Sequence, residues 1–488
     1  MMSDTLTLSN PKLLKQQCLI KDSWQDSSDG ATIEVTNPFS GQTIGTIPSL
    51  TEQDVIDTIA YADKVQASWA AKTAQERGEL LQKWADLIDD NQEDLAVLMT
   101  AEQGKPLTES RGEMAYANSF IRWFAEEGKR VYGDVIPATK TSLRHVIIKQ
   151  PVGVCAIITP WNFPAAMITR KVGPALAAGC TVVIKPATQT PFSALALGVL
   201  AEQAGIPAGV IQIVTGKSSM IGEVLTSDNR VKKLSFTGST EVGRTLMAQC
   251  APTIKKLSLE LGGNAPFIVF DDGDLEAAAD GLIASKFRNA GQTCVCANRI
   301  YVQASVRDKF LDIFTKKVAA LKVGNGMDED VDIGPLINED GLEKVQTLLQ
   351  DALDKGAKVV TGGDKNDASK LSFNPTVVTN VTTEMDIAQE EIFGPIATIF
   401  TFEEEAEAIQ KANDTIFGLA AYFYSRDYTR SWRVTEALEY GIVGHNTGLI
   451  STEVAPFGGI KQSGFGREGS KYGIEEYVSI KYWCSAVS

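Results

Sequence analysis

Residues 154–185 read VCAIITPWNFPAAMITRKVGPALAAGCTVVIK, and this stretch decides the fold. Its two ends, 154–159 and 181–185, are short apolar runs typical of buried strands, and residues 164–179 between them have the length and pattern of a helix. The alternation continues with a helix at 191–204 and strands at 210–214 and 233–236. Short apolar strands that alternate with helices predict an α/β fold with a parallel sheet covered on both faces.

A second α/β unit is expected after residue 260. Its strands are predicted at 266–270, 300–303, 396–402 and 420–424, with long helices such as 307–321 between them. The apolar spacing predicts helices in the first third of the chain, and Thr51-Glu52-Gln53-Asp54 is typical of a helix start. Gly104 and Pro106 are expected to end this helical pattern. Two alternating strands, near 143–149 and 475–483, belong to neither sheet by sequence order. They could pair with each other or extend the sheet of a neighbouring subunit.

Composition excludes several classes of partner. The 488 residues carry 46 basic and 61 acidic side chains, a net charge of −15, which argues against nucleic acid or an anionic membrane as the main partner. Seven cysteines in so long a chain are no disulfide framework. Residues 1–10 lack a signal-peptide pattern, and no apolar run has membrane-spanning length, so we expect a cytoplasmic protein. With only two histidines and no Cys/His cluster, no metal site is expected.

Two motifs carry the chemistry: Glu260-Leu261-Gly262-Gly263-Asn264 and Gly291-Gln292-Thr293-Cys294-Val295-Cys296. A thiolate can attack a carbonyl carbon, and a carboxylate can activate the water that later releases the acyl group. Most cysteines are small buried hydrophobes, and we expect this of Cys155, Cys180 and Cys250. Cys294 instead lies in a polar segment led by glycine. Glu260 lies inside an apolar run, where a charge needs either a partner or a catalytic task.

Two further segments could bind a nucleotide. In residues 236–243, FTGSTEVG, a strand ends, Gly238 permits close backbone approach, and Ser239 can cap a helix whose N-terminus faces a phosphate. Residues 464–469, GFGREG, match the dinucleotide fingerprint GxGxxG, but the expected preceding strand is missing. We therefore interpret 464–469 as a turn-rich loop near the active site.

Together these motifs resemble the aldehyde dehydrogenase superfamily, from about residue 37 to residue 469. Further segments that carry the resemblance are 159–164 (TPWNFP), 185–188 (KPAT), 390–395 (EEIFGP) and 456–459 (PFGG). The resemblance implies two parallel-sheet α/β domains and a small β bridging element. The implied division is a dinucleotide-binding domain of residues 1–132 and 151–259, a catalytic domain of 260–470, and bridging or oligomerisation strands at 133–150 and 471–488.

The same resemblance implies roles for individual residues. Cys294 would be the nucleophile, Glu260 the general base, and the Asn162 amide would hold the oxyanion together with the backbone N–H of Cys294. Lys185 would hold the adenosine ribose, Glu391 would hold the nicotinamide ribose with Phe393 beside it, and Leu261 would flank the nicotinamide. The full set of cofactor residues is Trp161, Lys185, Thr188, Gly238, Ser239, Leu261, Glu391 and Phe393.

Within the superfamily the chain is most similar to succinate-semialdehyde dehydrogenases, through residues 167–171, 287–289 and 449–451. The resemblance implies that Arg170, Arg288 and Ser451 grip the substrate carboxylate, which suits the paired donors of arginine. Alternatively, either arginine forms a surface or interdomain ion pair. Glutarate semialdehyde, one methylene longer, is the nearest rival substrate. A non-redox cysteine acyltransferase or hydrolase, and a binding protein on an inactive enzyme fold, are the alternatives of other classes.

Three expectations concern cofactor, redox state and assembly. Many NAD-dependent relatives carry Glu at the position of Thr188, where a carboxylate would repel a 2′-phosphate, so NADP is expected to be preferred over NAD. Alternatively Thr188 is neutral and other contacts decide. Cys296 could form a regulatory disulfide with Cys294, as the resemblance suggests, or be a buried spectator. The resemblance of the two isolated strands to the family's bridging elements implies a homotetramer built as a dimer of dimers.

Overall fold

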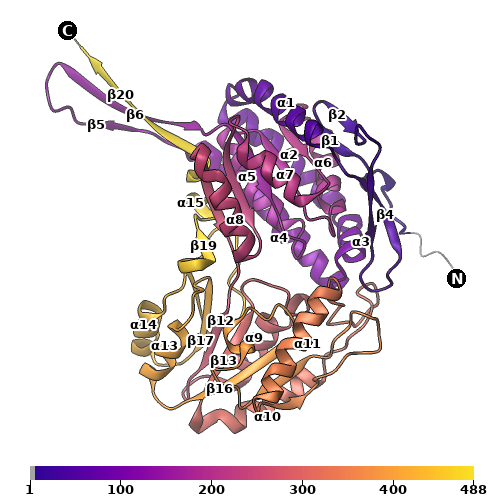
Figure 1. Cartoon of the computed structure of the whole chain (residues 1–488). Helices are drawn as coiled ribbons and strands as arrows, with labels where there is room; N and C mark the ends of the chain where they lie inside the picture. Colours follow the sequence, from indigo (N-terminus) through magenta and orange to yellow (C-terminus); the bar gives the residue numbers. More distant parts are fainter. Residues whose placement is uncertain (1–5, 488) are drawn as a thin grey trace.

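The computed structural model describes residues 6–487. Residues 1–5, part of the segment examined for a signal peptide, and residue 488 lie outside that range. The chain forms two lobes, one above the other, and a β arm that projects from the upper lobe (Figure 1). The predicted α/β class is confirmed, with parallel strands dominating both large sheets. No helix within residues 6–487 is long and apolar enough to span a membrane.

The upper lobe contains an eight-stranded sheet in the order β19-β11-β10-β7-β8-β9-β1-β2. Its five inner strands are parallel; four of them were predicted, and β11 was not, while the edge strands β1, β2 and β19 are antiparallel. These edge strands were not predicted, because runs of two or three residues show no periodicity. The bounds are β1 Cys18–Ile20, β2 Ser23–Gln25, β7 Val154–Ile158, β8 Val182–Lys185, β9 Ile211–Ile213, β10 Val231–Thr237, β11 Lys256–Glu260 and β19 Gly464–Phe465.

Alternate residues of the inner strands point into two different cores, as the strand period of two requires. On β7, Cys155 and Ile157 join one core, whereas Val154 and Ala156 join the other. The helices that cover these faces are α5 Ala166–Ala178, α6 Phe192–Gln203, α7 Ser218–Ser227 and α8 Thr240–Cys250. Both faces are covered, so the strands read as continuous apolar runs in the sequence.

Four helices precede the sheet's inner strands: α1 Glu52–Ala70, α2 Ala74–Asp90, α3 Gln92–Gln103 and α4 Leu107–Glu127. The predicted start of α1 is confirmed, since Thr51 and Asp54 form a reciprocal capping box. The sequence pattern was taken to stop at Gly104 and Pro106, and α4 was missed. Gly104 does end α3 in a left-handed conformation, but Pro106 is the N-cap of α4. Helix α4 packs along α5 and forms one wall of the site described below.

The lower lobe holds a seven-stranded sheet in the order β14-β15-β16-β13-β12-β17-β18, parallel except at β14. The strand bounds are β12 Ala265–Val269, β13 Ala297–Gln303, β14 Lys358–Thr361, β15 Thr376–Thr379, β16 Ile396–Phe402, β17 Ala420–Tyr424 and β18 Ile442–His445. The helices are α9 Leu275–Lys286, α10 Arg307–Ala319, α11 Glu339–Asp354, α12 Asp386–Gln389, α13 Glu405–Asn413 and α14 Tyr428–Ala437. The last helix, α15 Ser470–Glu475, packs against α4 and α5 of the upper lobe. Short 3₁₀ helices are Pro11–Leu13, Gly128–Arg130, Ala251–Thr253, Arg288–Gly291, Ala304–Val306 and Lys461–Ser463.

The projecting arm is a three-stranded antiparallel sheet in the order β20-β6-β5 (Figure 1). Its strands are β5 Asp134–Ile136, β6 Leu143–Pro151 and β20 Val478–Ala486, and a separate hairpin joins β3 Thr32–Thr36 to β4 Thr43–Pro48. Strands β20 and β6 pair along their whole lengths, so the first of the two sequence-based alternatives, mutual pairing, is confirmed. The arm exposes large apolar side chains, including Val135 (80% exposed) and Ile480 (70% exposed).

Candidate active site

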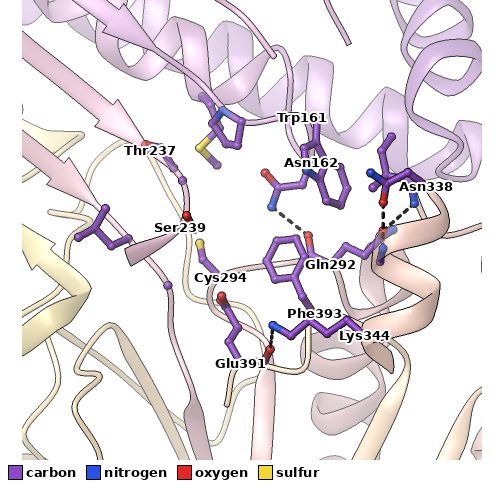
Figure 2. Close-up of a pocket in the computed structure, with 17 residues that line it drawn as sticks. Trp161, Asn162, Thr237, Ser239, Gln292, Cys294, Asn338, Lys344, Glu391 and Phe393 are labelled. Carbon is purple, nitrogen blue, oxygen red and sulfur yellow. Dashed lines mark hydrogen bonds between the residues drawn. The ribbon is translucent and has the colours of Figure 1, made fainter. Parts of the chain in front are cut away.

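Two pockets lie between the lobes and share Met167 and Cys294 as common wall residues. The first, pocket A, has a volume of about 280 Å³. It is lined by six of the residues expected to hold the cofactor, Trp161, Gly238, Ser239, Leu261, Glu391 and Phe393, together with Asn162 (Figure 2). The second, pocket B, has a volume of about 300 Å³ and is lined by all three residues expected to hold the substrate, Arg170, Arg288 and Ser451. One thiol therefore stands between two separate binding spaces.

The loop before Cys294 has a strained backbone. Asn289, Ala290 and Gly291 all adopt left-handed conformations, with φ of 51°, 54° and 74°. A Cβ at Gly291 would lie 2.2 Å from the carbonyl oxygen of Gly394, so glycine is required there. The backbone N–H of Asn289 donates to the Glu109 carboxylate at 2.9 Å, which holds the turn. Strain of this kind persists only where surrounding contacts impose it, and it accumulates at functional sites.

The two chemical motifs of the sequence meet at Gly263 and Cys294. A Cβ on Gly263 would lie 2.2 Å from the carbonyl oxygen of Cys294. The glycine pair after β11 therefore lets this segment run directly against the backbone of the nucleophile candidate. Glu260, the last residue of β11, is brought to the same region by the same strand.

The thiol of Cys294 is held in its neutral form. Burial raises its pKa to about 12, and the positive charge of Arg170 opposes this rise without cancelling it. An unperturbed thiol has a pKa of about 8.5. The Cys294 side chain points into pocket A in the neighbourhood of Glu391 and Phe393 (Figure 2).

Asn162 presents its amide opposite Cys294. Its Nδ2 donates to the carbonyl oxygen of Gln292 at 2.9 Å, which leaves the second amide hydrogen for a ligand, and its Oδ1 has no hydrogen-bond partner within residues 6–487. The backbone of Asn162 is fixed from behind, because its carbonyl oxygen accepts from Lys105 Nζ at 2.7 Å and from Asn289 Nδ2 at 3.0 Å.

A buried ion pair supports that loop. Lys105 Nζ lies 2.6 Å from Glu113 Oε2, and both side chains are excluded from solvent. The other oxygen of Glu113 accepts from the backbone N–H groups of Ala165 and Ala166 at the start of α5. Lys105 and Glu113 thus fix both ends of the turn that carries Asn162.

Glu260 is a buried carboxyl group with 2% exposure, and neither of its oxygens has a hydrogen-bond partner in the described chain. Burial and the neighbouring Glu468 carboxylate raise its pKa well above the usual value. Glu468 itself forms buried ion pairs with Arg170 and Lys171 of α5. Those two cations hold the pKa of Glu468 below its usual value against the effect of burial. Glu260 therefore adjoins a charged network but has no direct ionic partner of its own.

In pocket B, the two arginines differ. Arg170 is ion-paired with Glu468 and stacks over Phe457 at 4.4 Å. The alternative considered from the sequence, that Arg170 forms an ion pair, therefore holds for part of its guanidinium group. Its Nη2, however, has no hydrogen-bond partner in the described chain. Arg288 forms no ion pair with any residue in 6–487, and its guanidinium stacks on Phe163 at 5.2 Å. Both arginines thus keep binding capacity on the wall of pocket B.

The remaining cofactor candidates lie outside pocket A. Lys185, at the end of β8, is 4% exposed, and its Nζ makes one hydrogen bond within residues 6–487, to Ser218 Oγ at 2.8 Å. Burial lowers its pKa to about 8. Thr188 follows in the next turn and is half-buried. Glu391, by contrast, lines pocket A; it accepts from the backbone N–H of Gly263 at 3.0 Å, and burial raises its pKa to about 7.

Cys155, Cys180 and Cys250 are buried, as predicted. Cys296 is a buried free thiol, and Lys286 Nζ donates to its Sγ at 3.3 Å. The backbone N–H of Cys296 donates to the carbonyl oxygen of Thr293 at 3.1 Å, so the segment from Cys294 to Cys296 is bent rather than extended. A disulfide with Cys294 would require the Cys296 thiol to leave Lys286.

Several residues of the site were missed in the sequence. Glu109, Glu113 and Tyr116 line pocket B from α4, a helix that was not predicted. Glu468 lies in the 464–469 loop. The GxGxxG match of this loop was not taken as a nucleotide-binding motif, and Glu468 itself was given no role. An acidic residue within a glycine-rich loop near the active site could have identified Glu468 as a candidate.

This fold, with one thiol between two pockets and a buried carboxyl group nearby, defines an α/β oxidoreductase of the cysteine-dependent class. The model of the Aldehyde dehydrogenase family matches residues 24–483, and the chain belongs to this family.

The comparisons with individual proteins cover nearly the full length. The chain is 58% identical over 479 residues to succinate-semialdehyde dehydrogenase [NADP(+)] GabD of Escherichia coli (strain K12), covering 98% of this chain and 99% of that protein. It is also 58% identical over 482 residues to the glutarate-semialdehyde dehydrogenase of Pseudomonas putida (strain KT2440), covering 99% and 100%. The crystal structure of an aldehyde dehydrogenase from Brucella melitensis biovar abortus 2308 superimposes with a TM-score of 0.98 at 63% identity, covering 99% of both chains.

The buried pair behind Asn162 is testable. Lys105→Met leaves the Glu113 carboxylate buried and unpaired, which typically costs about 3–5 kcal/mol of stability. We expect a clear fall in the denaturation temperature together with a lower kcat, because the Asn162 carbonyl loses a donor. The double variant Lys105→Met, Glu113→Gln should recover part of the stability, since no unpaired charge remains.

The control is Arg111→Met, which breaks the solvent-exposed pair between Arg111 and Glu93. Exposed ion pairs contribute little, so this variant should denature close to wild type. A Lys105→Met protein as stable and active as Arg111→Met would contradict the positioning role.

Proposed function

We propose that the protein oxidises succinate semialdehyde to succinate with NADP, through a covalent thioester on Cys294. The observation that carries the proposal is the position of Cys294 between pocket A, which fits a nicotinamide nucleotide, and pocket B, whose wall presents two arginines. Arginine donors in a partly desolvated pocket suit a planar carboxylate. The name of the Escherichia coli relative agrees with this substrate and cofactor.

Each residue of the centre has a step in this mechanism. The Cys294 thiol releases its proton to water as its sulfur bonds to the aldehyde carbon, and the resulting oxyanion is held by the free Nδ2 hydrogen of Asn162 and the backbone N–H of Cys294. The nicotinamide, which Leu261 and Phe393 would flank, would supply the hydride acceptor, and loss of hydride from the carbon leaves a thioester on Cys294. Glu260 then takes a proton from water as the water attacks the thioester, and the acid and free thiol are released.

The residues of the upper lobe fit a dinucleotide. Lys185 is a buried ammonium with three donors, of which the described chain uses one, so it can donate to ribose hydroxyls or to a phosphate. Ser239 caps α8, and the Glu391 carboxylate stands at the base of pocket A. These residues would hold the adenosine ribose, the phosphates and the nicotinamide ribose respectively, with Trp161, Gly238, Leu261 and Phe393 around the nicotinamide side.

NADP should be preferred over NAD, because Thr188 stands where many NAD-dependent relatives carry a carboxylate and imposes no repulsion on a 2′-phosphate.

Residues 1–132 and 151–259 would form the dinucleotide-binding domain and residues 260–470 the catalytic domain. Free cysteines throughout the described chain support a cytoplasmic location. The nearest alternative substrate is glutarate semialdehyde, which the Pseudomonas putida relative is named for.

The substrate assignment is tested with a panel of aldehydes. Wild type should have a much higher kcat/KM for succinate semialdehyde than for hexanal, and glutarate semialdehyde should differ from succinate semialdehyde by only about 1–3 kcal/mol, the effect of one methylene. Arg288→Ala should raise KM for both carboxylated substrates and leave hexanal unaffected. A preference for hexanal, or an unchanged KM in Arg288→Ala, would overturn the assignment.

The covalent mechanism is tested by two variants. Cys294→Ala should abolish dehydrogenase activity with the fold intact by circular dichroism. Glu260→Gln should release about one equivalent of NADPH per site in a burst and then stall, because deacylation lacks its base. Only ionised Glu260 can accept a proton, and its pKa is raised, so the rate of wild-type deacylation should increase as pH rises. This rise with pH should be absent from the pH–rate profile of Glu260→Gln. More than trace turnover by Cys294→Ala would refute the mechanism.

Cofactor preference is tested with Thr188→Glu. A carboxylate near the 2′-phosphate site adds like-charge repulsion worth up to several kcal/mol, so the ratio of kcat/KM with NADP to that with NAD should fall by about tenfold or more. Thr188→Val, which removes the hydroxyl without adding charge, is the matched control and should shift the ratio less. A wild type that strongly prefers NAD, or an unmoved ratio in Thr188→Glu, speaks against the proposal.

The projecting arm of β5, β6 and β20 should join subunits into a homotetramer, a dimer of dimers. Residues 471–475, within the predicted bridging segment 471–488, belong to helix α15 instead of a strand. Apolar groups such as Ile480 and Trp483 are exposed on the arm, and one edge of β20 is unpaired within residues 6–487. Light scattering should report a tetramer for wild type and a smaller species for Ile480→Asp. Ser479→Asp, on the same exposed strand but without loss of an apolar group, is the control. A stable, active wild-type monomer would disprove this assembly.

A further inference from the structure

Pocket B contains a polar group that the sequence did not single out. Tyr116 lies on α4. It is one of four pocket-lining residues at positions i, i+3, i+4 and i+7 on one face of that helix: Glu109, Gly112, Glu113 and Tyr116. Its ring packs edge-on against Phe120, with centroids 4.9 Å apart and an interplanar angle of 72°. The ring is therefore held in a fixed orientation at the pocket wall.

The hydroxyl of Tyr116 is closed off from solvent, and no hydrogen bond of good geometry reaches it within the described chain. The guanidinium of Arg170 is close enough to interact with its oxygen, which leaves the hydroxyl hydrogen without an acceptor. Because buried hydroxyl groups nearly always have partners, this hydrogen can be donated to a ligand. Burial raises the pKa of Tyr116, and the charges of Arg170 and Arg288 oppose the rise. The group is consequently a neutral phenol that can donate, with two guanidinium charges nearby.

Other donors around pocket B are unpartnered as well. Arg170 Nη2, Arg288 Nε and the hydroxyl of Thr293 are buried without a hydrogen-bond partner in residues 6–487. All three residues line pocket B, as Cys294 does. Glu468 already occupies one side of Arg170, so this arginine cannot turn its whole guanidinium fork to a substrate. A group with two acceptor oxygens would satisfy several of these donors at once.

We infer that Tyr116 is a specificity-determining residue that donates its hydroxyl hydrogen to the substrate carboxylate, beside Arg170 and Arg288. This inference rests on the proposed function, because it concerns the carboxylate end of the same substrate. The phenol supplies the donor that Arg170 loses to Glu468. Uncharged aldehydes have no oxygen at this position and gain nothing from Tyr116.

The experiment compares Tyr116→Phe with wild type on two four-carbon aldehydes, succinate semialdehyde and butanal, with NADP and the full-length protein. A hydrogen bond to a charged group is strong, so kcat/KM for succinate semialdehyde should fall about 10- to 100-fold. The loss should appear in KM, since the carboxylate is held equally in the ground and transition states. With butanal, kcat/KM should change less than twofold. Tyr428→Phe, which alters a tyrosine that is 75% exposed, should match wild type on both substrates.

Product inhibition gives an independent reading. The inhibition constant of succinate should rise by a similar factor in Tyr116→Phe, and Tyr116→Met should behave alike if the phenylalanine variant fails to fold. Equal losses with both aldehydes, or no loss with succinate semialdehyde, would overturn the role of Tyr116. A wild type that prefers butanal would instead overturn the proposed function. A wild type that prefers succinate semialdehyde while Tyr116→Phe loses nothing would overturn this inference alone.

Discussion

The site is organised around the carboxylate of Glu468, buried between Arg170 and Lys171. Two buried cations on adjacent positions of α5 require a buried anion, because unpaired charges at such depth are strongly destabilising. By meeting this requirement, Glu468 ties the 464–469 loop to the upper lobe. It also places a negative charge next to Glu260 and restrains Arg170 at the wall of pocket B. One ion-pair cluster thus adds to the rise in the pKa of Glu260 that burial causes, and it limits which donors of Arg170 can face pocket B.

A second constraint acts on the nucleophile. Three consecutive left-handed residues before Cys294 can exist only because their neighbours impose them: Glu109 accepts from Asn289, and Gly291 fits against Gly394. Asn289 also donates to the carbonyl oxygen of Asn162. The loop that carries Cys294 and the loop that carries Asn162 are therefore one hydrogen-bonded unit, and neither can shift without the other.

The sequence allowed prediction of features that depend on local pattern. Most inner strands of both sheets, though not β11 or β15, and helix α1 follow from apolar periodicity and a capping box. The motif residues around Cys294 and Glu260 follow from their type and setting. Features that depend on distant partners were not predictable in this way. Strand β19 has two residues and exists only as an edge of β11. The pairing of Glu468 with Arg170 joins the last part of the chain to α5. Helix α4 was missed because Pro106 was taken as a stop, although proline also suits a helix start. Because α4 was missed, its pocket-lining residues Glu109, Glu113 and Tyr116 were missed too.

The ionisation states of the site share one physical origin. Burial raises the pKa of Cys294 to about 12, so this thiol is neutral in the ligand-free protein, and burial also raises the pKa of Glu260. A neutral thiol is a poor nucleophile and a poor target for oxidants, because the thiolate is the reactive species. In the proposed mechanism, reactivity would therefore come with ligands, which would bring the oxyanion to Asn162 and the carboxylate to the donors of pocket B. An aldehyde that carries its own anion can engage Arg170 and Arg288 beside the thiol, whereas an uncharged aldehyde leaves those buried donors unsatisfied. Burial of the site would thus account both for the preference for carboxylated aldehydes and for a thiol that reacts only when ligands are bound.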